Sequence, residues 1–346
     1  MQNIESSRVL LMRAARERQS RAGQSTSLFA AGFLVFCLLS ALLISWQPLQ
    51  LSILTVFLFT GPHNWMEFRY FLQRMPARWG KSGRFYTVGL GGVALLTASY
   101  ITLYALGQSW YLNASAWALS IAVWNTCLIL WVCSLLYLRG RERRGRDWSW
   151  TFAAGFALCA LAWTAPLMFS LGLVYLHPLI ALLFFDRQLK RSRPQWRRAY
   201  HLCLAAVPVL LVLMWTQLAQ AAPLADADEL SWRITQHAGA GILTGVNSHL
   251  LVATHVFLET IHYGMWLVLI PLVGLSAPVW QTRKVPLAVH RRGWPRAVRT
   301  VLLLGLFVVL ILWAGFLFDY TRARDIYFAV AMAHVLAEAP FLIRLL

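Results

Sequence analysis

The chain has 346 residues, of which 59% are hydrophobic and only 13% are charged, and its mean hydropathy is +0.58. Soluble globular domains carry about 25% charged residues, so this composition excludes an ordinary soluble protein. It is typical of an all-α, polytopic integral membrane protein. The net charge of +18 raises a second interpretation, a nucleic-acid-binding protein, which depends on where the basic residues lie.

Apolar segments long enough to span a bilayer recur along the whole chain. A membrane-spanning helix needs about 20 residues, and we expect a bundle of about ten such helices. Residues 1–26 precede them as a basic tail, and 27–346 form a single transmembrane domain with a polar loop near 220–244. The segments lie near 27–46, 50–68, 85–107, 115–138, 148–170, 171–186, 200–219, 245–277, 300–318 and 326–344.

The basic residues fall on alternate loops of this ten-helix arrangement. Of the 31 arginines and lysines, 28 lie in the N-terminal tail, in 69–84, 139–146, 187–198 and 283–299, or at Arg344. Loops rich in arginine and lysine face the cytoplasm, so both termini are predicted to be cytoplasmic and the 220–244 loop external. The charge is therefore explained by topology and by contact with membrane lipids, not by a nucleic-acid partner. A multi-pass protein of a bacterial-type inner membrane is expected.

Three times a histidine is followed four residues later by a glutamate inside an apolar segment. The pairs are His63/Glu67, His255/Glu259 and His334/Glu338. Residues at i and i+4 share one helix face, so each pair directs two polar groups the same way. A charged side chain at the bilayer centre costs roughly 2.5 to 3.5 kcal/mol on insertion scales, so such groups usually face a bundle interior and carry a function.

The 245–277 segment carries the densest group. His255, Glu259 and His262 are at i, i+4 and i+7, within about 60° of arc on a helical wheel. His63, His177, His334 and the 255–262 stripe can all reach one layer near the bilayer midplane, whereas His201, His237 and His290 lie in or beside loops and are not expected to. His177, next to Pro178, is also compatible with a purely structural role.

Histidines combined with carboxylates are the ligand set of non-haem iron sites. We predict a metal centre with His63, His255, His262 and His334 as ligands and His177 as a further candidate. The three glutamates, Glu67, Glu259 and Glu338, are expected to be ligands, hydrogen-bond acceptors for the imidazoles or proton-transfer groups. A mononuclear four-histidine centre and a carboxylate-bridged two-metal centre both fit the pattern.

The segment Gly61-Pro-His-Asn-Trp-Met-Glu67 resembles the Pro-His-Gly-x-x-Asp segment of the Brp/Blh family of membrane-embedded carotenoid-cleaving dioxygenases. Asn64 and Glu67 stand where that family has glycine and aspartate. The helix around His255 and His262 is similar to the family's later histidine helix in residue type and placement. The resemblance implies a multi-helix membrane enzyme that cleaves a carotenoid, with His63, His255 and His262 as iron ligands.

The sequence leads to a metal-dependent oxygenase, with iron as its cofactor, that takes a hydrophobic lipid or carotenoid-like substrate from the bilayer. Three alternatives use the same residues. An intramembrane hydrolase would hold zinc through three histidines, a haem protein would use paired histidines on facing helices, and a proton-coupled transporter would relay protons through His/Glu chains without metal. Any single His/Glu pair could also be a structural hydrogen-bonding pair between helices.

Overall fold

The computed structural model describes residues 2–108, 113–143, 147–224, 228–274, 282, 285–290 and 294–345, with side chains from residue 23 onward. Within these ranges the regular structure is entirely helical. The α-helices are α1 (Gln2–Trp46), α2 (Pro48–Arg74), α3 (Gly83–Gln108), α4 (Ala114–Glu142), α5 (Trp150–Thr164), α6 (Pro166–Ser192), α7 (Pro194–Leu204), α8 (Ala206–Leu218), α9 (Glu229–His237), α10 (Ser248–Gly264), α11 (Ile270–Gly274), α12 (Pro286–Val289), α13 (Pro295–Phe318) and α14 (Tyr320–Leu345). A 3₁₀ turn, η1 (Gly80–Ser82), precedes α3, and a π-helical segment, η2 (Met265–Leu269), links α10 to α11.

Eight helical segments of the described chain are long and apolar enough to cross a membrane. The prediction of a multi-pass helical membrane protein is confirmed at this level. Two of the ten expected spans are not among the eight, because α5 has only 15 residues and α2 carries polar residues along its length. The expected boundary at 170/171 lies instead at Ala165, since Pro166 begins α6 at the position where proline is best tolerated.

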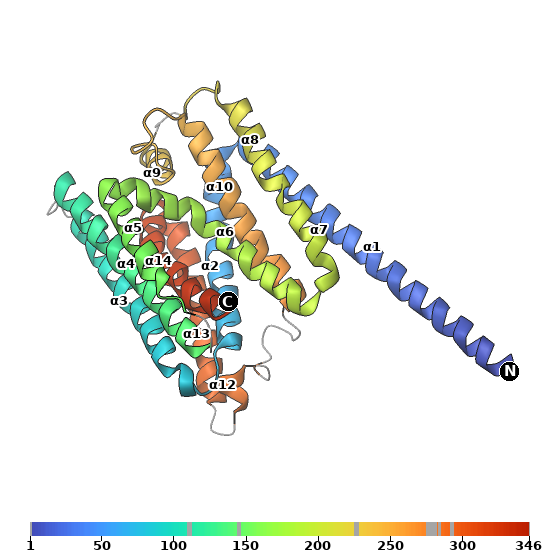
Figure 1. Cartoon of the computed structure of the whole chain (residues 1–346). Helices are drawn as coiled ribbons and strands as arrows, with labels where there is room; N and C mark the ends of the chain where they lie inside the picture. The colour runs from blue at the N-terminus through green and yellow to red at the C-terminus, as the bar shows by residue number, and fades with distance from the viewer. Residues whose placement is uncertain are drawn as a thin grey trace.

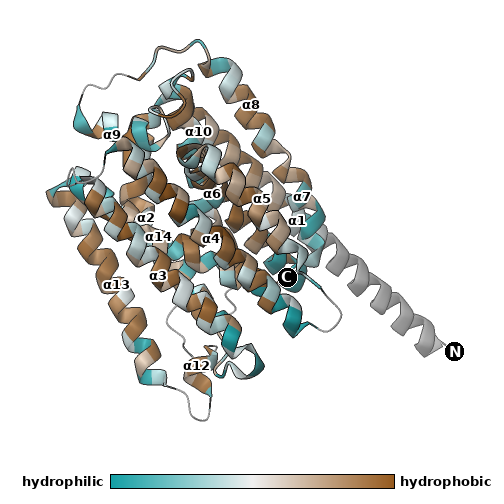
Figure 2. Ribbon diagram, turned by 60° about the vertical axis from the view of Figure 1, so that its left-hand side comes forward, coloured by the Kyte–Doolittle hydropathy of each residue, from teal (hydrophilic) through white to brown (hydrophobic). Residues whose placement is uncertain are grey.

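The helices surround a central group formed by α2, α6, α10 and α14 (Figure 1). One side of this group is covered by α3, α4 and α5, and the other by α1, α7 and α8, while α13 packs against α2 and α14. Figure 2 shows hydrophobic residues along the length of α13 and α8. Outward leucines and phenylalanines on α13, such as Phe307 and Leu304, are more than half exposed. Such a surface suits a hydrocarbon solvent and would be an aggregation liability in water.

Four aromatic side chains pack together in the centre, one from each helix of the central group. Phe71 stacks on Phe341 with ring centroids 4.4 Å apart, and it also contacts Phe184 and Trp266. Phe184 and Trp266 lie 5.4 Å apart. We call these residues the aromatic plug. They close one end of the polar site that the same helices carry.

Candidate metal centre

Four histidine rings meet in the middle of the bundle, one from each helix of the central group. His63 (α2) lies 5.3 Å from His262 (α10), centroid to centroid, and 5.2 Å from His334 (α14). His177 (α6) lies 4.7 Å from His262 and 5.3 Å from His334. His262 and His334 are 6.4 Å apart. Each ring therefore has two near neighbours, which arranges the four as the corners of a square.

The square and the aromatic plug together fix the direction of the four helices. In each case the plug residue lies C-terminal to the histidine: Phe71 follows His63, and Phe341 follows His334. Phe184 follows His177, and Trp266 follows His262. Because both layers are in contact, α2, α6, α10 and α14 must run parallel past the site. Parallel neighbours need long connections, and these are supplied by the intervening helices.

Each of the four helices carries a proline or a π-helical segment near its histidine. Pro62 precedes His63 inside α2, Pro178 follows His177 inside α6, and Pro340 lies inside α14. In the fourth helix the π-helical Met265–Leu269 segment begins three residues after His262. Proline removes a backbone hydrogen bond, and π-helical segments are frequent at functional sites. Such irregularities are tolerated at membrane depth where protein buries the freed backbone groups.

Two of the imidazoles are oriented by backbone carbonyls. His63 Nδ1 lies 2.9 Å from the Phe59 carbonyl oxygen, and His262 Nδ1 lies 3.4 Å from that of Pro178. A carbonyl oxygen can only accept, so each Nδ1 carries the hydrogen and each Nε2 keeps its lone pair. His262 Nε2 is buried and has no hydrogen-bond partner. This is the state in which an imidazole ligates a metal.

Two glutamates lie against the histidine square, and both are completely buried. Glu67 and Glu338 are each 0% exposed, and none of their four carboxylate oxygens has a hydrogen-bond partner in the described chain. The one ion-pair contact described for them is between Glu338 Oε2 and His177 Nδ1, 3.0 Å apart. Two carboxylates taken out of water without compensating charge are strongly unfavourable. A bound cation would compensate this charge.

A single transition-metal ion fits the square. With metal–nitrogen bonds of about 2.1 Å, ring centroids lie about 3.2 Å from the ion, so neighbouring rings are separated by about 4.5 to 5.2 Å and opposite rings by about 6.4 Å. The observed separations of 4.7 to 5.3 Å and 6.4 Å agree with this. Ligand atoms of His63, His262, His334 and Glu67 all lie within 4.8 Å of one another, and His177 forms a second such group with His262 and Glu338. The ion would satisfy both the unpaired nitrogens and the carboxylate charge.

The predicted ligand His255 and its partner Glu259 are not in this square. His255 precedes His262 by seven residues and Glu259 precedes it by three on α10, where His255 Nδ1 is 3.6 Å from Glu259 Oε2 and the His255 ring is 5.0 Å from that of His237. We call His237, His255 and Glu259 the α9 cluster. Burial and the positive charge of Arg324 hold the pKa of His237 well below its usual range, so this ring is neutral near pH 7.

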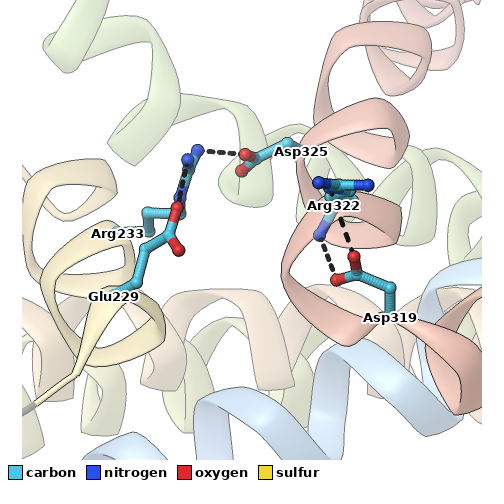
Figure 3. Close-up of polar contacts among 5 residues, drawn as sticks. All are labelled: Glu229, Arg233, Asp319, Arg322 and Asp325. Atoms are coloured by element: carbon cyan, nitrogen blue, oxygen red, sulfur yellow. Dashed lines mark hydrogen bonds and ion pairs between the residues drawn. The ribbon is translucent and has the colours of Figure 1, made fainter.

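The α9 cluster contains a histidine that the sequence pattern did not select. His237 was expected to remain in the outer loop, but it ends the short helix α9, which begins with Asp228 accepting a hydrogen bond from the Ser231 N–H. Arg233 then ties α9 to α14 through Asp325 and is itself paired with Glu229 (Figure 3). The Asp-Ala-Asp-Glu run at the head of α9 was the available signal for a capped helix.

A cavity of about 850 Å³ connects the histidine square with the α9 cluster. Its remaining lining is mainly apolar and comes from α3, α4, α5, α6, α9 and α14. Trp150, Leu158 and Leu176 line it and are also 46% to 65% exposed on the outside of the bundle. An apolar wall of this kind faces lipid, so the cavity is placed to admit a hydrophobic molecule from the side.

Comparisons with known proteins identify no relative for this arrangement. No protein-family model, curated protein or solved structure matches the chain. The resemblance to the Brp/Blh family is therefore limited to residues 61–67 and to the helix around His255 and His262. The functional assignment has to come from the chemistry of the site.

Proposed function

We propose that this chain is a membrane-embedded oxidoreductase that holds one non-haem iron ion through His63, His177, His262 and His334 and acts on a hydrophobic substrate from the bilayer. The observation that supports this most is the square of four imidazoles beside two fully buried carboxylates, one of which contacts His177. The square borders the apolar cavity. A redox metal beside a lipid-accessible cavity is the arrangement expected of an oxygenase of the kind that cleaves carotenoids or oxidises lipids.

Iron is favoured over zinc by the number of histidines. A catalytic zinc ion has three protein ligands and keeps its fourth position for water, so four imidazoles would close a tetrahedral zinc site. Iron accepts more than four ligands and would retain open positions for dioxygen and substrate. A haem is disfavoured because it would need two axial histidines with a porphyrin between them. In the square, the other two imidazole rings occupy that space. A proton relay is disfavoured because the histidines converge on one point instead of forming a path.

The protein's part in the chemistry is positioning and exclusion of water. When bound, iron would supply the activation of dioxygen. Glu338 orients the His177 ring, and backbone carbonyls orient His63 and His262. The aromatic plug seals one end of the square, and the apolar cavity binds the substrate beside it. Glu259, which lines the same cavity, is placed to accept or return a proton at the other end.

Elemental analysis of detergent-purified protein, with an absorption spectrum of the same sample, tests this proposal. We expect one iron per chain, no Soret band, and consumption of dioxygen on addition of a carotenoid or unsaturated lipid. A protein that takes up zinc in place of iron would support the hydrolase alternative, and a Soret band would support the haem protein. Failure to retain any metal after reconstitution with ferrous iron would contradict the metal centre itself.

We also propose that α2 and α5 complete ten membrane crossings, with both ends of the chain in the cytoplasm. The basic residues on alternate connections support this arrangement. A C-terminal fusion to green fluorescent protein is expected to fluoresce in bacterial cells, whereas a C-terminal fusion to alkaline phosphatase is expected to be inactive. The opposite pair of results would place the C-terminus outside and contradict the topology.

A further inference from the structure

A buried arginine in the cavity has no described partner for its charge. Arg324 lies on α14 near the α9 cluster, is 3% exposed and lines the cavity. Its Nε is buried without a hydrogen-bond partner, and its guanidinium lies 4.6 Å from the centroid of the Phe328 ring. No ion pair to Arg324 is found in the part of the chain that the structure describes.

The neighbouring acidic residues are engaged elsewhere. Asp325 pairs with Arg233 of α9, and Asp319 pairs with the exposed Arg322 (Figure 3). Glu259 has His255 as its described ion-pair contact, and it attracts Arg324 only at longer range. A guanidinium cannot lose its proton at ordinary pH, so burying it without a carboxylate in direct contact is costly. Its place in a cavity that can hold a ligand suggests that the counter-ion comes with that ligand.

We propose that Arg324 binds the carboxylate of a long-chain fatty acid, or of a closely similar amphiphile, and that the apolar chain runs through the cavity past the histidine square. This inference rests on the proposed function, whose substrate class it names. The planar guanidinium matches a carboxylate with two parallel hydrogen bonds, and the contact with Phe328 fixes its plane.

The charges around Arg324 favour a single negative charge. Glu259 lines the same part of the cavity and would repel a doubly charged phosphate head group. One guanidinium balances one carboxylate. The neutral His237 ring and the hydroxyl groups of Tyr263 and Tyr327, which also line the cavity, add polar groups without adding charge. A carboxylate is therefore the head group that this end of the cavity accepts best.

The distance from Arg324 to the metal centre sets a chain length. Arg324 and His334 lie on the same helix ten positions apart, a rise of about 15 Å, which is the length of an extended acyl chain of roughly twelve carbons. The walls along this path include Leu128, Val132 and Leu136 of α4. A chain of sixteen to eighteen carbons would thus present its middle or far half, not its carboxyl end, to the histidine square.

Binding of tritiated oleic acid and of tritiated methyl oleate to the full-length protein in zwitterionic nanodiscs tests the inference. The two probes differ only in charge at the head group. We expect the acid to bind at least ten-fold more tightly than the ester. Arg324→Gln should weaken binding of the acid at least ten-fold and leave the ester unchanged, whereas Arg324→Lys should retain part of the preference. Arg322→Gln, which alters an exposed arginine two residues away, is the matched control and should change neither.

Equal affinity of the wild-type protein for acid and ester would overturn the inference, even if Arg324→Gln did not fold. An Arg324→Gln protein that keeps the preference for the acid would also overturn it. A second metal ion that is lost on His237→Ala would overturn it as well, because the α9 cluster would then be a metal site. Binding is measured with and without iron. A preference for the acid in a chain that never binds iron would contradict the oxygenase proposal alone, and iron binding without the preference would contradict this inference alone.

Discussion

Replacing His262 by alanine is expected to abolish both iron binding and dioxygen consumption. The His262 ring is the near neighbour of His63 and His177 and lies opposite His334, so its removal leaves a gap at one corner of the square. We expect metal affinity to fall by more than the roughly 10- to 100-fold loss that follows removal of an orienting partner. Iron per chain, measured by elemental analysis after dialysis against a weak chelator, gives the result.

Two control variants make this result specific. His255→Ala changes a histidine on the same helix, but one that belongs to the α9 cluster, so this variant should keep its iron. His201→Ala changes an exposed histidine that pairs with Asp186 and should be indistinguishable from wild type. Loss of iron from His255→Ala, with retention by His262→Ala, would mean that the metal centre lies at the α9 cluster.

The double substitution Glu67→Gln/Glu338→Gln is expected to stabilise the metal-free protein and to destabilise the iron-bound one. Without metal the wild type buries two carboxylates, of which only Glu338 has a described ion-pair contact, to His177, and the amides remove that charge. With metal the wild type gains the binding free energy, about 4 kcal/mol when free iron is 1,000 times its Kd, and the variant loses much of it. Thermal unfolding in detergent, with iron and with chelator, measures both effects.

The diagnostic result is that the variant melts above the wild type with chelator and below it with iron. A variant that melts below the wild type under both conditions would show that the glutamates are ordinary packing residues. Glu142→Gln serves as the control, because Glu142 pairs with Arg139 and Arg344 at a helix end, away from the square. Its melting temperature should change equally with and without iron.

The spacing of residues in the sequence indicated most of the polar residues of the site, but not which of them lie together. The His/Glu pairs singled out His63 and His334, and the structure brings these two rings together with His262. A helical wheel, however, shows only angle, and it placed His255 with His262 because they share a face. Seven residues rise about 10.5 Å along a helix, which is too far for both to ligate one ion. The fourth corner is His177 instead, from a helix without a His/Glu pair.

The remaining features depend on packing that no local pattern encodes. His237 lies in a polar connecting segment, and only the capped helix α9 and its ion pair to α14 bring it against His255. Arg324 appeared to be an outer-loop charge, but the described α14 begins at Tyr320 and buries it. The count of spans differed because Pro166 begins α6 and leaves α5 with only 15 residues, and because α2 carries polar residues along its length.

Because α14 supplies both His334 and Glu338, the four-cornered square exists only after the last described helix has packed against the first ones. The helices that carry His63, His177 and His262 are therefore synthesised before the square can close. An ion held as proposed above would be captured only after α14 has inserted.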